Sequence, residues 1–209
     1  MSKLDFKTGI YAVQYRNSIL KELFRKSIHL CSAFIPSLLD FAYWPVIILL
    51  SCALVSYSIA ELLRMKGISI PVVSKITAVA ARKRDENKFV LGPVTLVIGI
   101  LISAFLWDPE FYRIGIYSLA FGDGLASLFG KLFGRIPIPL ANGKTVAGSL
   151  TCFIAVYISS FCVCMNAPIA LILGVTAMLI EVIPMLDFDN ICIPVFIGGL
   201  SQFLINGSF

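Results

Sequence analysis

The sequence predicts an all-α integral membrane protein, a single bundle of about seven transmembrane helices with a cytosolic N-terminus. The first observation behind this fold class is composition, since apolar residues make up 58% of the 209 residues and charged residues only 14%. Soluble domains carry about a quarter charged residues. So short a chain cannot bury this much apolar sequence in a soluble core, whereas a bilayer accommodates it.

The second observation is a series of apolar segments with the length of membrane-crossing helices. A helix confined to lipid satisfies its backbone hydrogen bonds internally, which the bilayer requires. Pro36 is expected to bend the first segment, and a tight turn from Pro184 to Asn190 joins the last two. The predicted spans are residues 27–41, 43–63, 91–107, 111–130, 146–164, 168–183 and 191–206.

The third observation is an unequal distribution of positive charge. Sixteen of the 17 lysines and arginines precede or begin the first span, or lie in the second-to-third or fourth-to-fifth connection; only Arg113 falls on the other side. The positive-inside rule places these segments in the cytosol. We therefore predict one polytopic domain over residues 1–209, with a cytosolic N-terminal segment 1–24, a cytosolic amphipathic loop 64–90 and a cytosolic nucleotide-binding loop 131–145. Residues 70–82 of the amphipathic loop are a candidate helix on the membrane surface.

Acidic residues interrupt three of the apolar segments. A carboxylate at the centre of a membrane helix costs roughly 2.5–3.5 kcal/mol, so each of these residues needs an explanation. Asp123, Glu181 and Glu61 all fall towards the cytosolic half in the predicted topology. Each also has a structural alternative: a pair with Arg64 for Glu61, and a helix–helix hydrogen bond for Asp123.

More polar residues follow Glu181 in the predicted turn. Asp187, Asp189 and Asn190 lie just beyond it on the same membrane face. Acids that converge beside cationic loops suggest a divalent cation that holds a phosphate compound. Asp189 or Asn190 has the alternative of capping the last helix.

Small residues surround Asp123 at a spacing of four. Gly122, Ala126, Gly130 and Gly134 form a stripe along one helix face. Such a stripe allows a second helix to approach closely. Beside an acid, it also allows the backbone to approach a ligand.

The loop after this stripe carries the features of a phosphate site. Lys144, Thr145 and Ser149 stand at the start of the fifth helix, whose free N–H groups favour anions. The GKT tripeptide resembles a Walker loop, but Ile138 stands where that motif needs glycine, so a P-loop is excluded. A cytosolic anchor loop without a ligand is the alternative.

A third cluster lies where the first helix enters the membrane. Arg25, Lys26 and His29 share one helix face, and His29 is the only histidine. They are candidate phosphate ligands, with headgroup anchoring as the alternative.

Five motifs follow one another along the chain: RKxxH, an acid and an arginine that end the second helix, GDxxAxxxGxxFGR, GKTxxGS and ExxPxxDxDNxxxP. They occupy Arg25–His29, Glu61–Arg64, Gly122–Arg135, Gly143–Ser149 and Glu181–Pro194. This combination resembles the family of dolichol kinase, phytol kinase and CTP-dependent diacylglycerol kinase, from Arg25 to the last helix. The loop before the third helix departs from the family's R-x-x-E, with Lys83 and Glu86 in those places.

The resemblance implies a membrane enzyme that transfers the γ-phosphoryl of CTP, or of another nucleoside triphosphate, to a lipid alcohol such as a polyprenol, an isoprenoid alcohol or diacylglycerol. It also implies Mg²⁺ or another divalent cation, and Asp123, Lys144, Glu181, Asp189 and Asn190 as the central polar residues. Asp123 and Asp187 are the candidate general bases. With the residue patterns above, the expected groups are catalytic Asp123, Lys144, Glu181 and Asp187; phosphate-binding Gly122, Gly130, Arg135, Gly143, Lys144, Thr145, Gly148, Ser149, Arg25, Lys26 and His29; and metal-binding Asp123, Glu181, Asp189 and Asn190.

Two other functions fit part of the pattern. Phosphatidate cytidylyltransferases share a Gly-Asp helix and a lysine–threonine–glycine loop, but their C-terminal histidine–glycine–glycine signature is absent from this sequence. A small transporter would need polar residues at the outer ends of the spans, which are nearly bare. The expected partners are CTP, a lipid alcohol and membrane lipids, with no nucleic acid. The expected location is the cell membrane of a prokaryote or the endoplasmic reticulum of a eukaryote, with the active site on the cytosolic face.

Overall fold

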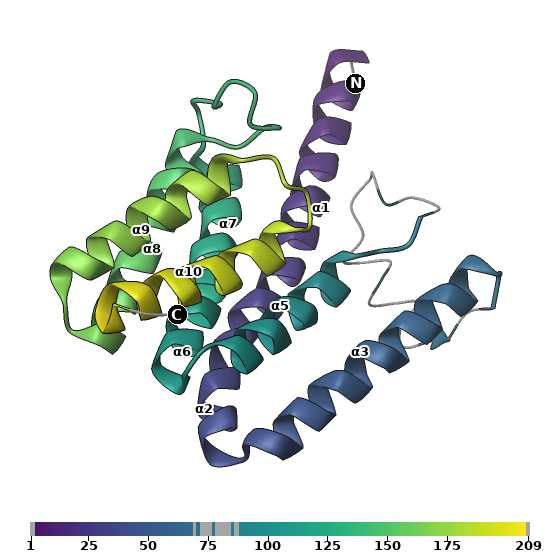
Figure 1. The fold of residues 1–209 in the computed structure, drawn as a ribbon. Coiled ribbons are helices and arrows are strands. Elements are labelled where there is room, and N and C mark those ends of the chain that lie inside the picture. Colours follow the sequence, from purple (N-terminus) through teal and green to yellow (C-terminus); the bar gives the residue numbers. More distant parts are fainter. Residues whose placement is uncertain (1–2, 69, 72–76, 78–84, 86–87, 208–209) are drawn as a thin grey trace.

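The computed structural model describes residues 3–68, 70, 71, 77, 85 and 88–207, and over this part of the chain the named elements are all helices (Figure 1). They are α1 (Lys3–Cys31), η1 (Ser32–Phe34), α2 (Ile35–Phe41), α3 (Tyr43–Met65), α5 (Gly92–Leu106), α6 (Pro109–Tyr117), η3 (Ser118–Asp123), α7 (Gly124–Phe133), α8 (Val146–Cys164), α9 (Ala167–Val182) and α10 (Asp189–Asn206). The predicted all-α fold class is confirmed.

The predicted first span is the end of one helix and the whole of the next. α1 gives way to the short 3₁₀ turn η1, and α2 then begins with Pro36 in its first turn. Proline lacks a backbone N–H and crowds the carbonyl four residues earlier, here Ser32, so the regular helix is interrupted just before it. The predicted surface helix 70–82 lies mostly outside the described residues, as do Lys83 and Glu86.

Among the described helices, α3 and α8 are long and apolar enough to cross a membrane, judged by length and composition, while α5 and α9 are shorter apolar helices. α3 contacts α5 and the preceding α2 and lies apart from the remaining helices (Figure 1). Only 17% of its most apolar stretch is buried. A helix with so little cover is unlike the core helix of a soluble protein, which is apolar because it is enclosed.

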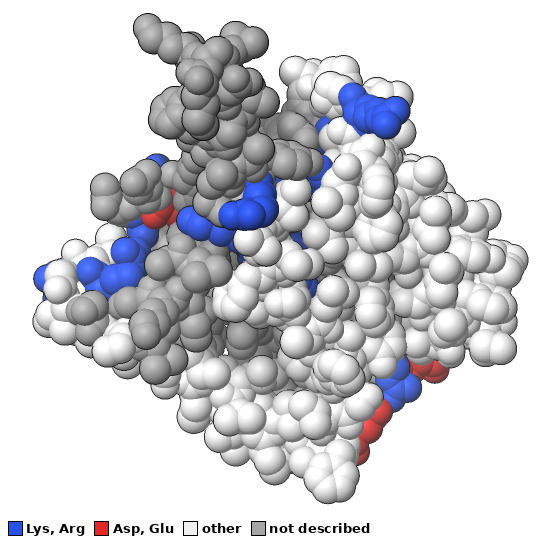
Figure 2. Space-filling view, turned by 180° about the vertical axis from the view of Figure 1, so that it is seen from behind, with Lys and Arg blue, Asp and Glu red and all other residues white. Residues whose placement is uncertain are grey.

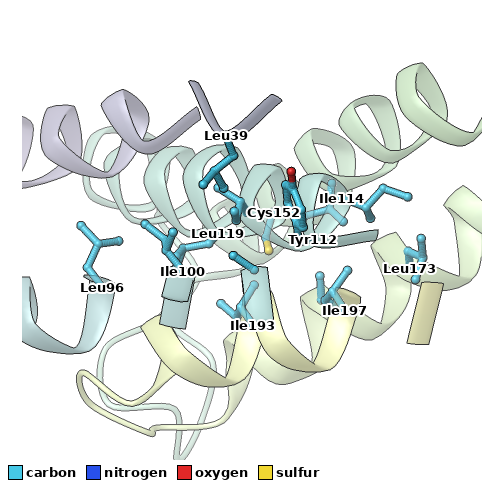
Figure 3. Close-up of a cluster of buried hydrophobic side chains, with 14 of the residues drawn as sticks. Leu39, Leu96, Ile100, Tyr112, Ile114, Leu119, Cys152, Leu173, Ile193 and Ile197 are labelled. Carbon is cyan, nitrogen blue, oxygen red and sulfur yellow. The ribbon is translucent and has the colours of Figure 1, made fainter. Parts of the chain in front are cut away.

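The core lies where α5, α6, η3, α8, α9 and α10 meet (Figure 3). Ile193 and Ile197 of α10 point into this cluster towards Ile100 and Leu119. α10 approaches α5 very closely, because a Cβ added at Gly99 would collide with the backbone carbonyl of Asn190. This contact fixes the start of α10, which carries the acidic residues of the predicted turn.

The small-residue stripe packs α7 against the start of α8, as the sequence predicts. A Cβ at Gly130 would lie 2.9 Å from Thr145 Oγ1 and 3.3 Å from the Cα of Gly148. Gly134 is equally confined by the Thr145 side chain. Close backbone contact thus brings the glycine–aspartate motif and the GKT motif together.

The surface charges are segregated. Figure 2 shows lysines and arginines towards one end of the molecule, a broad uncharged surface and a small charged group towards the other end. Arg113, the one cation predicted on the outer side, pairs with Asp40 at 2.5 Å.

Candidate active site

Four of the sequence motifs border one cavity of about 550 Å³, which falls within the range of small-molecule sites, about 300–1,000 Å³. Its polar lining mixes cations and acids. Arg25 and Lys26 come from α1, Lys131 from α7 and Lys144 from the loop before α8. The acids are Glu22, Asp123, Glu181 and Asp189, and Ala126, Ser127, Gly130, Asn142, Gly143, Thr145, Gly148, Pro184 and Leu186 complete the lining.

A lysine and the histidine of α1 both lie beside the carboxylate of Asp123. Lys26 Nζ donates to Asp123 Oδ2 at 2.5 Å, and both side chains are buried. His29 Nδ1 lies 3.1 Å from the same oxygen but outside hydrogen-bond geometry, so this nitrogen is buried without a hydrogen-bond partner. Asp123 ends the π-helical segment η3, a type of distortion that frequently marks functional sites.

Glu22 organises the next turn of α1, and the sequence analysis missed it. It accepts hydrogen bonds from Arg25 and from Ser127 Oγ of α7, the latter at 2.8 Å, and Lys131 lies 4.0 Å away. Burial raises the pKa of Glu22, but Arg25, Lys26 and Ser127 outweigh burial and hold it below its ordinary value. Its position three and four residues before Arg25 and Lys26 is the sequence signal that identifies it.

The GKT loop is hydrogen-bonded to the end of α9. Lys144 Nζ donates to the backbone carbonyl of Glu181, lies 3.5 Å from Glu181 Oε1 and reaches the carbonyl of Ile183 at 3.3 Å. Ser149 Oγ donates to Glu181 Oε2 at 3.0 Å. Both oxygens of the Glu181 carboxylate therefore face polar groups of the GKTxxGS motif, which suits a positioning role better than the predicted metal ligation.

The free helix amides predicted at the start of α8 are largely occupied. Val146 N donates to the carbonyl of Ile136 at 3.1 Å, and Ser149 N to that of Thr145 at 3.0 Å. Gly148 N donates to Thr145 Oγ1, the N-cap of the helix, at 3.2 Å. These three N–H groups therefore have partners within the loop and the cap, and phosphate binding by the amides of Thr145–Ser149 stays a prediction.

The surroundings of Asp189 oppose the ionisation of its carboxyl group. Burial, reinforced by the neighbouring Asp123 carboxylate, raises the pKa of Asp189 to about 7. Its Oδ1 accepts the N–H of Asn190 at 3.0 Å. The N-cap position of α10 belongs to Phe188, so neither Asp189 nor Asn190 is the cap.

The acids do not form a closed metal cage. Among the described residues, no three His, Cys, Asp or Glu side chains are grouped closely enough to hold a metal ion. The structure also separates Asn190 from the predicted metal ligands, because its amide donates to Thr95 Oγ1 at 3.0 Å and it lines a different cavity. Asp123 and Asp189 still fit Mg²⁺, which one or two carboxylates commonly bind together with substrate phosphates. Their mutual repulsion is what a cation between them would relieve.

Three of the other predicted residues lie apart from the large cavity. Glu61 takes its structural alternative: it accepts two hydrogen bonds from Arg64, each at 2.8 Å, and the N–H of Val90 at 2.9 Å. Arg135 is exposed and does not line the cavity. Gly122 faces Val156 and Cys152 of α8, so its role is packing.

The remaining predicted residues are near the site. Asp187 and His29 line a second cavity of about 30 Å³, which also touches Arg25 and Lys26. Gly143, with a φ of 80°, adopts a conformation that favours glycine in the turn before Lys144. Gly143 therefore contributes to the site by allowing the turn that positions Lys144.

Comparison with known proteins gives several relatives named phytol kinase and one uncharacterized protein. The chain is 32% identical to phytol kinase 1, chloroplastic, of Arabidopsis thaliana over 148 residues, which are 66% of this chain and 47% of that protein. It is 26% identical to probable phytol kinase 1, chloroplastic, of Oryza sativa subsp. japonica over 204 residues, 86% of this chain and 63% of that protein. An uncharacterized protein of Methanocaldococcus jannaschii is 29% identical over 137 residues, 65% of this chain and 69% of that protein.

The match covers about half the length of the Arabidopsis protein. No protein-family model matches the chain, and no solved structure matches it. The chain is therefore homologous to proteins named phytol kinase, which confirms the resemblance to the lipid alcohol kinase family that its motifs indicate.

Proposed function

We propose that this chain is an integral membrane kinase that transfers the γ-phosphoryl of CTP to the hydroxyl of a lipid alcohol on the cytosolic face. The observation that carries the proposal is the meeting of four separate motifs around one cavity that mixes cations with acids. The homology to proteins named phytol kinase supports both the reaction class and the choice of an isoprenoid alcohol as the first acceptor to test.

The cavity has the two kinds of group that phosphoryl transfer requires. Catalysis of this reaction is mainly positioning and neutralisation of charge on the transferring group. Lys144 and Lys131 border the cavity and would neutralise the charge of the triphosphate. Asp123 and Asp189 would hold Mg²⁺, which would supply neutralisation of the negative charge on the triphosphate.

The reaction balances without an oxidant or a further co-substrate. The alcohol oxygen forms a bond to the γ-phosphorus, and the bond from that phosphorus to the β,γ-bridging oxygen breaks. CDP leaves with the electron pair of the broken bond, and the hydroxyl proton passes to a base or to water. The products are CDP and the lipid monophosphate.

A cytidylyltransferase is the second candidate, because a lipid phosphate acceptor needs cations and the RKxxH motif supplies them. The pairing of these cations favours the kinase. Lys26 is engaged by Asp123 and Arg25 by Glu22, so acids already offset the positive charge of the motif. A neutral alcohol is compatible with such a site, whereas a second phosphate would have to compete with both carboxylates.

Radiolabelled CTP separates the two reactions. Purified protein in lipid vesicles is incubated with Mg²⁺, a panel of long-chain alcohols headed by phytol, and either γ-labelled or α-labelled CTP. We expect label in the lipid product from γ-labelled CTP only, with release of CDP. Recovery of the α-label in lipid with release of pyrophosphate, dependent on phosphatidate, would overturn the kinase proposal.

A further inference from the structure

We propose that the small cavity between α1 and α5 is the binding site for the hydroxyl end of the acceptor alcohol, separate from the nucleotide cavity. This inference rests on the proposed function and locates its second substrate. Apolar and polar groups line the cavity together: Ile28, Val90, Pro93 and Leu96 with His29, Asp85, Asp187, Asn190, Arg25 and Lys26. An alcohol presents the same combination, with a polar oxygen at the end of an apolar chain.

Size separates the two cavities. The small cavity has a volume of about 30 Å³, against about 550 Å³ for the large one. The smaller volume holds about two water-sized groups, which suits a hydroxyl and its adjoining carbon. It excludes a triphosphate or a nucleoside. The two substrates are thereby sorted by volume.

The two cavities also adjoin each other. Arg25 and Lys26 line both of them, so a hydroxyl in one and a γ-phosphate in the other lie on opposite sides of the same pair of side chains. Transfer needs the reacting atoms to come within about 3–3.5 Å. The wall that the cavities share includes the side chains of Arg25 and Lys26, and side chains can rearrange more readily than backbone to allow this approach.

His29 is a buried polar residue in the wall of the small cavity. The residue is only 5% exposed, and its Nδ1 lies 3.1 Å from Asp123 Oδ2. Because Asp123 lines the large cavity, His29 joins the walls of the two cavities.

Hydrogen bonds from α10 and α3 hold the α5 side of the cavity wall. On the α5 side, Asn190 holds the first turn of the helix through Thr95 Oγ1 and the carbonyl of Gly92, at 3.0 and 3.3 Å. The segment before that turn is held by α3, since Tyr57 OH donates to the carbonyl of Val90 at 3.2 Å. A site assembled on helix ends that are themselves clamped is suited to positioning a reactive group.

Gly92 provides a direct way to narrow the cavity. It lines the small cavity, and a Cβ added there meets no described atom within 4 Å, so the position accepts a larger side chain without a clash at the Cβ. Ile28 lines the opposite wall from α1. We expect Gly92→Leu and Ile28→Phe each to raise KM for the alcohol by about 10-fold or more, and to leave KM for CTP unchanged. Leu91→Phe is the matched control, because Leu91 precedes Gly92, is exposed and does not line either cavity.

Photocrosslinking tests the same site without relying on turnover. The probe is a long-chain primary alcohol with a diazirine close to its hydroxyl, and adducts are mapped by mass spectrometry. We expect adducts around residues 25–29 and 88–96, decreased in Gly92→Leu and Ile28→Phe and retained in Leu91→Phe. Adducts confined to the large-cavity segments 126–131 and 142–148, or labelling that neither narrowing variant decreases, would overturn the assignment. If the adducts form at the small cavity but no γ-phosphoryl is transferred, the proposed function fails and the alcohol site stands.

Discussion

Lys26 Nζ lies 2.5 Å from Asp123 Oδ2, although 97 residues separate the two in the chain. The pair joins the RKxxH motif of α1 to the glycine–aspartate motif at the end of η3. Both side chains are buried, so the pair contributes to the packing of α1 against η3 as well as to the charge of the cavity. Stability and activity therefore have to be measured separately at this position.

Asp123→Asn is expected to abolish turnover and to destabilise the protein. Removal of one member of a buried ion pair costs about 3–5 kcal/mol, because the other charge stays buried without compensation. The double variant Lys26→Met/Asp123→Asn removes both charges, so its thermal unfolding temperature in detergent should return towards that of the unmodified protein. Its kinase activity should not return. Full activity in either variant would remove Asp123 from the reaction.

Lys144→Ala is expected to lower kcat/KM for CTP by about 100-fold to 1,000-fold, comparable to the loss of one preorganised charge donor. Lys144 is the cation of the GKT loop that borders the cavity, and its position is set by the end of α9. Steady-state kinetics with varied CTP measures the change. KM for the alcohol serves as the internal control and should stay within about twofold. A twofold change corresponds to less than about 0.5 kcal/mol. Unchanged CTP kinetics would assign the loop a structural role alone.

Asp189→Asn is expected to raise the Mg²⁺ concentration for half-maximal activity by about 10-fold to 100-fold, a range typical of altered metal-site shells. Asp189 lines the large cavity and is close enough to Asp123 for the two carboxylates to repel. Activity is measured across a Mg²⁺ titration after removal of divalent ions with EDTA. Asp108→Asn is the control, since Asp108 is exposed and lines neither cavity. An unchanged Mg²⁺ dependence in Asp189→Asn would exclude this residue as a ligand.

Glu61→Gln is expected to lower the free energy of unfolding by about 1.5–3 kcal/mol, the usual contribution of hydrogen bonds to a charged group. Glu61 is fully buried, pairs with Arg64 of the same helix and accepts the N–H of Val90, which joins the segment before α5 to α3. Since Val90 lines the small cavity, KM for the alcohol should rise while KM for CTP does not. Glu110→Gln, at an exposed position, is the control. A stable variant with unaltered kinetics would contradict the role of this clamp.

Cysteine labelling tests the predicted orientation in the membrane. In a variant without the six native cysteines, Leu140→Cys should react with an impermeant maleimide only after the membrane is opened. Glu110→Cys, in the short connection where Arg113 also lies, should react in intact cells. Leu140 is 97% exposed and Glu110 is exposed as well, so access to reagent and not burial decides the result. Labelling of Leu140→Cys from outside intact cells would reverse the topology.

The sequence alone was sufficient to predict the helical fold class and most helix boundaries. α3, α8 and α9 begin and end within about two residues of the predicted spans. This agreement has a local cause, because the length of an apolar run and the capping residues at its ends determine where a helix can form. The motifs are local in the same way, so their residue types already indicated phosphate chemistry.

Tertiary structure decided which of these motif residues meet. The pairing of Lys26 with Asp123 and the contacts of Lys144 and Ser149 with Glu181 depend on how helices pack. Packing also decides that Asn190 and Asp189 line different cavities. Glu22 enters the site for the same reason, since its partner Ser127 is 105 residues away. Helix periodicity specifies which residues share a face of one helix, but it does not specify which other helix covers that face. Close contacts at glycines such as Gly99 and Gly130 make that choice, because only there can two backbones approach closely enough to bring distant side chains together.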